Sequence, residues 1–251
     1  MTSFLERILA SRKQAVERQV NVPEHQLTPT RDFRGALAAS GISLIAEIKR
    51  ASPSRGDLNP SLVPGQLAAS YERGGARAVS VLVEPEFFKG SEDDLVAARA
   101  EVSVPVLWKD FVISPAQVMR ARYVGADGIL VIVRILDDTT LHMIMRLARD
   151  LDLCPLVEVF DERDLERALD AGADVIGVNH RDLETFEEDP TATKRLRPLV
   201  PEGVVLVGES AISTRADVED LEGIGVDAIL VGEALVRAAD PAAKIRELLG
   251  T

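Results

Sequence analysis

Charged side chains stand at the ends of several apolar segments, where a protein core ordinarily excludes them. Glu47 and Lys49 end the run LIAEIK, Lys109 lies in PVLWKDF, Glu158 in PLVEVF and Glu209 in VVLVGES. An unpaired buried charge costs several kcal/mol, so we expect these groups to compensate one another in a network. Opposite charges nearby keep lysine protonated and glutamate ionised at neutral pH, which suits electrostatic and acid–base catalysis.

The alternative is that each charge faces solvent in a loop or belongs to a surface ion pair. That alternative suits one isolated residue better than five charged positions on four segments, all at the same end. The pattern therefore favours a catalytic cluster.

Two glycine turns predict a second function, the binding of a phosphate group. Gly208 lies in VGESAIS and Gly232 in VGEAL, which opens a short helix, while KRASPSRGD carries Ser52 after the first apolar run. Glycine permits close approach of the backbone, and backbone N–H groups at a helix start bind anions. The two turns, opposite a loop that bears serine and lysine, therefore indicate a phosphate site.

Eight apolar runs determine the expected architecture. Four of them follow a glycine and recur at a spacing of about 50 residues: GGARAVSVLV from Gly74, VGADGILVIV from Val124, AGADVIGVN from Ala171 and IGVDAILVG from Ile224. Each of these indicates a helix that ends at glycine, followed by a strand buried on both faces. The other four runs lie between them, at 44–49, 105–111, 155–160 and 204–210.

Helical patterns fill the gaps between these strands, as in PGQLAASYERGG, SPAQVMRARYVG and DERDLERALDAG. Ser114–Pro115 and the acidic pair Asp161 and Glu162 are start signals for two of these helices. Strands and helices therefore alternate along the chain.

Eight alternating units predict an α/β fold, a closed (β/α)8 TIM barrel, over residues 41–251. Residues 1–40 are expected to add one or two helices, with a turn near Pro23 and Pro29, within a single domain of residues 1–251. An open doubly wound sheet is the alternative, but the GxGxxG motif is missing after the first strand. In such barrels the chemistry gathers at the carboxyl ends of the strands, which is where the charged residues lie.

The composition of the chain limits the classes of molecule that we expect it to bind. The net charge of -12, from 41 acidic and 29 basic residues, argues against nucleic acid or an anionic membrane as the main partner. Cys154 is the only cysteine, which excludes an internal disulfide, and His25, His142 and His180 have no metal-ligand spacing, so no metal is expected. No signal peptide is evident, and no run approaches the roughly 18 apolar residues of a membrane span, so we expect a cytoplasmic protein.

The sequence resembles the indole-3-glycerol-phosphate synthase family in six ordered motifs: IAEIKRASPSRGD, FFKGSEDDL, PVLWKDF, LVEVFDE, GVNHRDLETFEED and VGESAIS. The resemblance extends from about residue 30 to the end of the chain. It implies a lyase of tryptophan biosynthesis that closes the ring of a carboxyphenylamino deoxyribulose phosphate and releases carbon dioxide and water. It implies a small phosphorylated aromatic substrate and neither cofactor nor metal, and we expect a monomer.

The resemblance also implies catalytic roles. Lys109 corresponds to the general acid, which assists ring closure and loss of the hydroxyl group, and Glu158 corresponds to the general base of the dehydration. Lys49 binds the substrate carboxylate or shares the acid role, while Glu47 orients the lysines and balances their charge.

Further residues are expected, by the same resemblance, to hold the substrate. Its polar groups would contact Asn179, Glu209 and Ser210, with Arg181 anchoring the loop after the sixth strand. Its aromatic ring would lie beside Phe111, Leu130 and Leu183. Its phosphate would bind Ser52 and the backbone around Gly208, Ala211, Gly232 and Glu233.

Four positions depart from the commonest pattern of the family. Trp108 stands where Arg is usual and should be neutral, because it neighbours Lys109 and so points into the strand–helix layer. His180 stands where Asn or Ser is usual. Ala211 replaces the usual Gly and does not easily take a positive φ, while Glu233 replaces a frequent Ser and adds negative charge near the phosphate.

Two other functions are alternatives. Phosphoribosylanthranilate isomerase is also a phosphate-binding barrel, but its chemistry resembles that of a Cys and Asp pair with the Cys at the end of the first strand. Here that strand ends in Glu47 and Lys49, and Cys154 lies elsewhere. A barrel retained as a non-enzymatic binding protein is the other alternative, and the costly charged cluster argues against it.

Overall fold

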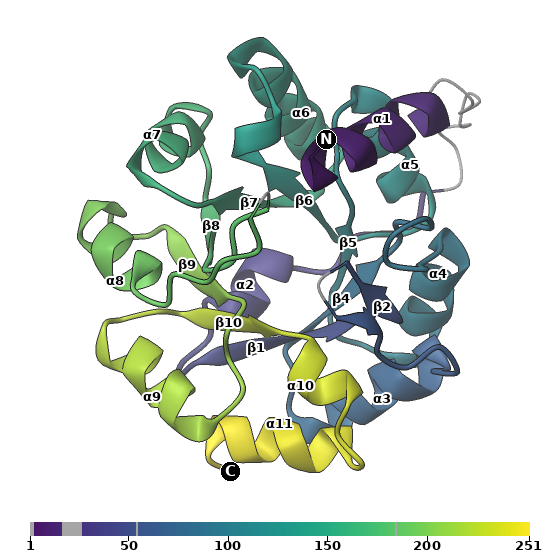
Figure 1. Ribbon diagram of the computed structural model, residues 1–251, viewed down its shortest axis with the longest axis vertical. Helices are drawn as coiled ribbons and strands as arrows, with labels where there is room; N and C mark the ends of the chain where they lie inside the picture. The colour runs from purple at the N-terminus through teal and green to yellow at the C-terminus, as the bar shows by residue number, and fades with distance from the viewer. Residues whose placement is uncertain (1–2, 17–26, 54, 184) are drawn as a thin grey trace.

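Eight parallel strands close into a barrel in the computed structural model, which describes residues 3–16, 27–53, 55–183 and 185–251. The strands are β1 (Ser43–Ile48), β4 (Ala78–Leu82), β5 (Val106–Lys109), β6 (Gly128–Ile132), β7 (Cys154–Val159), β8 (Val175–Asn179), β9 (Val205–Glu209) and β10 (Ala228–Val231). Neighbours in the chain pair with one another, and β1 pairs with both β4 and β10 (Figure 1). The predicted (β/α)8 TIM barrel is confirmed.

Helices surround the barrel between the strands (Figure 1). They are α3 (Pro64–Gly74), α4 (Glu92–Glu101), α5 (Pro115–Tyr123), α6 (Asp138–Asp150), α7 (Glu162–Asp170), α8 (Ala192–Leu196), α9 (Arg215–Gly223), α10 (Glu233–Val236) and α11 (Pro241–Leu249), with short 3-10 turns η2 (Val133–Ile135) and η3 (Arg197–Leu199). The side chains of Ser114 and Asp161 accept hydrogen bonds from the N–H groups of Ala116 and Asp164. Both predicted start signals therefore act as N-caps, of α5 and α7.

Strand side chains divide into two apolar layers because successive residues point to opposite faces. Ile45, Leu107 and Val207 belong to the layer inside the barrel. Trp108 is buried in the outer layer between strands and helices, as predicted from its position beside Lys109. The neighbouring Lys109 consequently points to the inside, at the carboxyl end of β5.

Among the described residues before the barrel, two helices are present, α1 (Phe4–Val16) and α2 (Phe33–Leu37). The buried side chains of α2 join the inner layer and cover the amino end of the barrel. Pro29 lies in an irregular segment between the two helices, and Pro23 lies outside the described residues.

The loop after β1 contains a small hairpin that the sequence pattern does not predict. Its two strands, β2 (Ala51–Ser52) and β3 (Gly56–Asp57), pair in antiparallel fashion. These strands are too short to show the alternation of apolar and polar side chains that identifies a strand in a sequence. Gly56 takes a positive φ of 66°, as in a tight turn. The hairpin places Ser52 beside the carboxyl ends of the barrel strands.

Candidate active site

A cavity of about 470 Å³ opens at the carboxyl ends of the barrel strands. It is lined by all but one of the residues that the sequence predicts for the site: Glu47, Lys49, Ser52, Lys109, Phe111, Leu130, Glu158, Asn179, Arg181, Leu183, Glu209, Ser210, Ala211, Gly232 and Glu233. The exception is Gly208, where a Cβ would lie 3.0 Å from a methyl group of Leu221. Glycine at this position makes room for α9, on the outside of the barrel.

Lys109 is the centre of the charged cluster. Its Nζ lies 3.2 Å from Glu209 Oε2, 3.6 Å from Glu158 Oε2 and 3.9 Å from Glu47 Oε2. Lys49 Nζ lies 2.8 Å from the other carboxylate oxygen of Glu47. The five charged residues therefore form one network across four strand ends, as predicted, and not separate surface ion pairs.

The cluster contains three carboxyl groups and two lysines. Burial raises the pKa of Glu209 to about 8; Lys109 opposes this rise and Glu158 adds to it by like-charge repulsion. Burial alone would lower the pKa of Lys109, but Glu209, Glu158 and Glu47 outweigh it and hold that pKa above its ordinary value. Burial also opposes the ionisation of Glu47, whose pKa is nevertheless lowered by Lys49 and Lys109.

The protonation states follow from these shifts. Lys109 is a cation and Glu47 an anion at neutral pH, in agreement with the prediction for the cluster. Glu209 differs from the expectation for the glutamates, because its raised pKa of about 8 favours the protonated form at that pH. The main cause is burial, to which repulsion from Glu158 and Glu47 adds.

Several polar atoms of the site lack a partner. Within the described part of the chain, one carboxylate oxygen each of Glu47, Glu158 and Glu209 and the hydroxyl of Ser52 are buried without a hydrogen bond. A buried polar group without a partner costs about 1–3 kcal/mol, which a bound ligand recovers where it supplies the missing hydrogen bond. The cavity therefore offers acceptors and a hydroxyl group to the polar atoms of a ligand.

The turn after β9 adopts an uncommon backbone conformation. Ser210 and Ala211 have φ values of 67° and 54°, so Ala211 takes the positive φ that its side chain disfavours. The Ser210 hydroxyl donates a hydrogen bond of 2.8 Å to Asn179 Oδ1, which also accepts from the Arg181 N–H at 3.0 Å. The ends of β8 and β9 are thereby joined at the edge of the cavity.

Glycine at residue 232 leaves room for the charged cluster. A Cβ on Gly232 would lie 2.5 Å from Glu47 Oε1 and 2.9 Å from Lys49 Nζ. The next residue, Glu233, is flanked by two arginines, at 3.7 Å from Arg55 Nε and 3.3 Å from Arg237 Nε. The negative charge that Glu233 brings to this side of the cavity is therefore offset locally.

Comparison with known proteins identifies the family. The family model described as indole-3-glycerol phosphate synthase matches residues 5–248. A relative from Streptomyces coelicolor, named indole-3-glycerol phosphate synthase 2, is 49% identical over 222 residues, which are 88% of this chain and 86% of the relative. Another, from Mycobacteroides abscessus, named indole-3-glycerol phosphate synthase, is 50% identical over 218 residues, 87% of this chain and 80% of the relative. The chain belongs to the indole-3-glycerol phosphate synthase family.

Solved structures outside the indole-3-glycerol phosphate synthase family share its fold. A 3-hexulose-6-phosphate synthase from Salmonella typhimurium has a TM-score of 0.67 at 17% identity and covers 83% of this chain and 97% of its own. A thiamine phosphate pyrophosphorylase from Pyrococcus furiosus has a TM-score of 0.63 at 16% identity, covering 86% and 96%. At such low identity these likenesses concern the fold alone.

The N-terminal helix contributes to the site of this indole-3-glycerol phosphate synthase family member, which the sequence alone does not reveal. Phe4 of α1 lines the cavity, and its ring centroid lies 5.2 Å from that of Phe186 in the loop after β8. A buried ion pair between Arg12 and Asp110, 2.5 Å long, attaches α1 to the end of β5. The charged and amphipathic sequence predicts a helix, but it carries no signal for where that helix docks.

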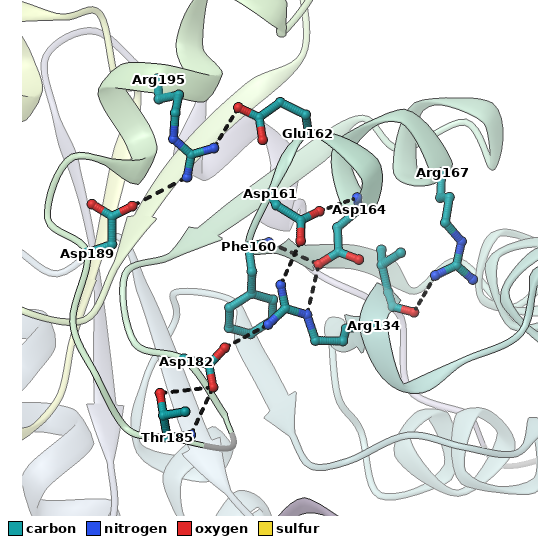
Figure 2. Close-up of polar contacts among 11 residues, drawn as sticks. Arg134, Phe160, Asp161, Glu162, Asp164, Arg167, Asp182, Thr185, Asp189 and Arg195 are labelled. Carbon is teal, nitrogen blue, oxygen red and sulfur yellow. Dashed lines mark hydrogen bonds and ion pairs between the residues drawn. The ribbon is translucent and has the colours of Figure 1, made fainter.

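Arg134 is a second residue that the sequence analysis missed. Its guanidinium group lies between three aspartates, at 2.9 Å from Asp182, 2.9 Å from Asp161 and 3.3 Å from Asp164, and 4.3 Å from the ring centroid of Phe160 (Figure 2). Asp182 lies in the loop after β8, which also brings Arg181 and Leu183 to the cavity. Arg134 therefore joins that loop to the start of α7.

Proposed function

We infer that this chain converts 1-(2-carboxyphenylamino)-1-deoxyribulose 5-phosphate to indole-3-glycerol phosphate, carbon dioxide and water, as a lyase of tryptophan biosynthesis. Membership of the indole-3-glycerol phosphate synthase family carries this activity. The structural observation that supports it best is the position of Lys109, a protonated amine surrounded by Glu47, Glu158 and Glu209 at the bottom of the cavity.

Ring closure requires an acid at the carbonyl oxygen of the sugar while an aromatic carbon attacks the carbonyl carbon. We assign the acid role to Lys109, because its three carboxyl neighbours keep it charged in a buried site where that charge acts strongly. The carboxylate on the attacking ring carbon then leaves as carbon dioxide, and the electron pair of the broken bond restores the aromatic ring. Lys49 is suitably placed to bind that carboxylate or to share the acid role, and Glu47 orients both lysines.

The dehydration that follows requires a proton for the departing hydroxyl group and a base for the proton lost from the ring. We assign the base to Glu158, whose buried Oε1 has no hydrogen-bond partner among the described residues. Lys109, 3.6 Å from the same carboxyl group, supplies the proton for the departing hydroxyl after it has regained a proton from solvent through the open cavity. Glu209, largely protonated, is in turn able to donate a hydrogen bond to a substrate oxygen.

Substrate binding is assigned to the remaining walls of the cavity. Phe111, Leu130 and Leu183 provide an apolar surface for the aromatic ring, while Asn179, Ser210 and Arg181 provide polar contacts. We assign the phosphate group to the Ser52 hydroxyl and the backbone of Ala211, Gly232 and Glu233, which also line the cavity. Gly208 does not line the cavity, so we assign it only an indirect role in phosphate binding, through the turn that follows it.

The isomerase alternative receives less support. Cys154 begins β7, whereas the cavity lies at the carboxyl ends of the strands. Burial raises the pKa of the Cys154 thiol to about 12, so the thiolate required for acid–base work is scarce at neutral pH.

We further propose that the chain acts as a monomer in the cytoplasm, on a small soluble substrate and without nucleic acid or membrane. Among the described residues, no helix is both long and apolar enough to pass through a bilayer.

The test of the activity is an assay of the purified chain for the fluorescence of indole-3-glycerol phosphate. We expect fluorescence to develop when the carboxyphenylamino substrate is added and no isomerisation of phosphoribosylanthranilate. Turnover of phosphoribosylanthranilate instead, or no turnover of either compound by folded protein, would contradict the proposal.

A further inference from the structure

The turn at Ser210 and Ala211 requires support from its surroundings. Both residues have positive φ values, and neither is glycine. Such a conformation is costly for a residue with a Cβ, and it persists only where neighbouring groups hold it. The Ser210 side chain is held by Asn179, which leaves the peptide bond between Ser210 and Ala211 to be explained.

His180 holds that peptide bond. Its ring is buried at the end of β8, with Nδ1 3.2 Å from the carbonyl oxygen of Ser210 and Nε2 2.6 Å from the hydroxyl of Thr193. A carbonyl oxygen only accepts, so Nδ1 carries the hydrogen and Nε2 accepts from Thr193. Burial also lowers the pKa of His180, which agrees with a neutral ring in this tautomer. Thr193 is itself buried in α8, so the imidazole is fixed from both sides.

The orientation of the carbonyl group determines that of the next N–H. In a trans peptide the two point in opposite directions, so a Ser210 carbonyl directed at His180 turns the Ala211 N–H away from the buried ring. Neither the N–H of Ala211 nor that of Ile212 donates a hydrogen bond within the described chain, and both residues line the cavity. Free backbone N–H groups that line a cavity are donors for an anion bound there.

We propose that His180 is a positioning residue for the substrate phosphate, which holds the Ser210–Ala211 peptide so that the Ala211 N–H faces the anion. This inference rests on the proposed function, which places the phosphate at the Ala211 turn. His180 is needed because residue 211 is alanine, whose Cβ disfavours the turn; glycine would take the same conformation without strain. The two residues are therefore expected to act as a pair.

The first test compares His180→Leu, which removes both ring contacts, with His180→Asn, whose amide group can still donate to the Ser210 carbonyl. We expect His180→Leu to raise KM about tenfold and to weaken competitive inhibition by inorganic phosphate by a similar factor, with kcat within about twofold of the parent. His180→Asn should lie within about threefold of the parent KM. Equal kinetics for all three proteins, or a fall in kcat alone, would overturn the proposal.

The second test adds Ala211→Gly to each His180 variant. Because glycine does not need the support, the KM of the His180→Leu, Ala211→Gly double variant should return to within about threefold of the parent. A purely structural role for His180 predicts no such recovery, so an unchanged KM in the double variant refutes the pairing. Should His180→Leu fail to fold, Thr193→Val takes its place in the test, because it removes only the contact at Nε2. Thr193→Val should raise KM by less than His180→Leu, and adding Ala211→Gly should lower KM again in the same way.

A measurement on the parent separates this inference from the function on which it rests. Melting is followed in inorganic phosphate and in chloride of equal ionic strength, and the indole fluorescence assay is run on the same sample. An active parent that phosphate stabilises, with His180→Leu equally stabilised, contradicts only the positioning role. A parent that produces no indole-3-glycerol phosphate contradicts the proposed function, and a parent that is active but not bound by phosphate refutes the anion site at this turn.

Discussion

Asp127 and Glu209 are buried acids at opposite ends of the barrel, each 1% exposed. They differ in the number of groups that bind their carboxyl oxygens. Asp127, just before β6, accepts hydrogen bonds from the backbone N–H groups of Arg31 and Val106 and from the Arg99 guanidinium, at 2.8, 2.8 and 2.5 Å. Glu209, at the end of β9, has one contact of 3.2 Å with Lys109, and its other oxygen has no partner among the described residues. The amino end uses a buried charge for stability, whereas the carboxyl end keeps its charges available to a ligand.

The largest effect is expected at the carboxyl end. Lys109→Met and Glu158→Gln should each lower kcat by on the order of 10²-fold or more, because each removes a positioned acid or base. Both variants should still fold, since the apolar layers are untouched. Fluorescence kinetics and urea unfolding of the same samples measure both properties, and a kcat within threefold of the parent would refute the assigned role.

The reverse result is expected at the amino end. Asp127→Ala leaves the Arg99 guanidinium and two backbone N–H groups without their acceptor, which should lower the free energy of unfolding by about 3 kcal/mol. kcat and KM at a temperature where the variant is folded should stay within about twofold, because Asp127 does not line the cavity. If Asp127→Ala loses activity while its stability is unchanged, the contrast between the two ends is wrong.

Substitution of Arg134 tests whether substrate binding depends on the position of the loop after β8, independently of the charged cluster. Arg134→Met should raise KM about tenfold with a smaller change in kcat, because the loop that bears Arg181 and Leu183 loses its attachment to α7. Arg134→Lys should recover part of the loss. The matched control is Arg120→Met, since Arg120 also combines an ion pair, with Glu92, and a ring contact, with Tyr123, but lies away from the cavity. Equal KM values for the two Met variants would show that the attachment is unimportant.

The smallest effect concerns the pH dependence of stability. The pKa of Glu209 is raised from 4.5 to about 8 in the folded chain, so folding favours its protonated form. Its contribution to stability is complete below the unfolded value and is lost as the pH rises through about 8. Between pH 7 and pH 8 the parent should therefore lose about 1 kcal/mol more unfolding free energy than Glu209→Gln, which cannot ionise. Parallel stability curves for the two proteins would mean that Glu209 is already ionised at pH 7.

Local sequence pattern was sufficient for the barrel and for most of the cavity. Glycine-terminated helices, apolar strands and the caps Ser114 and Asp161 are determined within a few residues, and a closed barrel brings the strand ends together whatever the details. The charged cluster followed because Lys109 and its partners are polar where a strand should be apolar.

The remaining features depend on contacts between segments that are distant in the chain. Nothing near Arg12 or Arg134 indicates that their partners are Asp110 and Asp182, and the protonation of Glu209 depends on the sum of charges from four strands. The left-handed conformation at Ala211 likewise runs against its own residue type. Such features are determined by tertiary structure and not by local preference.

The pairing of β1 with both β4 and β10 has a consequence for the order in which the chain is made. Ribosomes release the amino end first, so β1 and β4 emerge long before β10, which ends at Val231. Until then one side of β1 is an unpaired strand edge of the kind that promotes aggregation. Glu47 and Gly232, neighbours in the finished site, come from the two strands that close this gap. A nascent chain thus acquires its catalytic cavity and loses its exposed edge in the same event, when β10 becomes available to pair with β1.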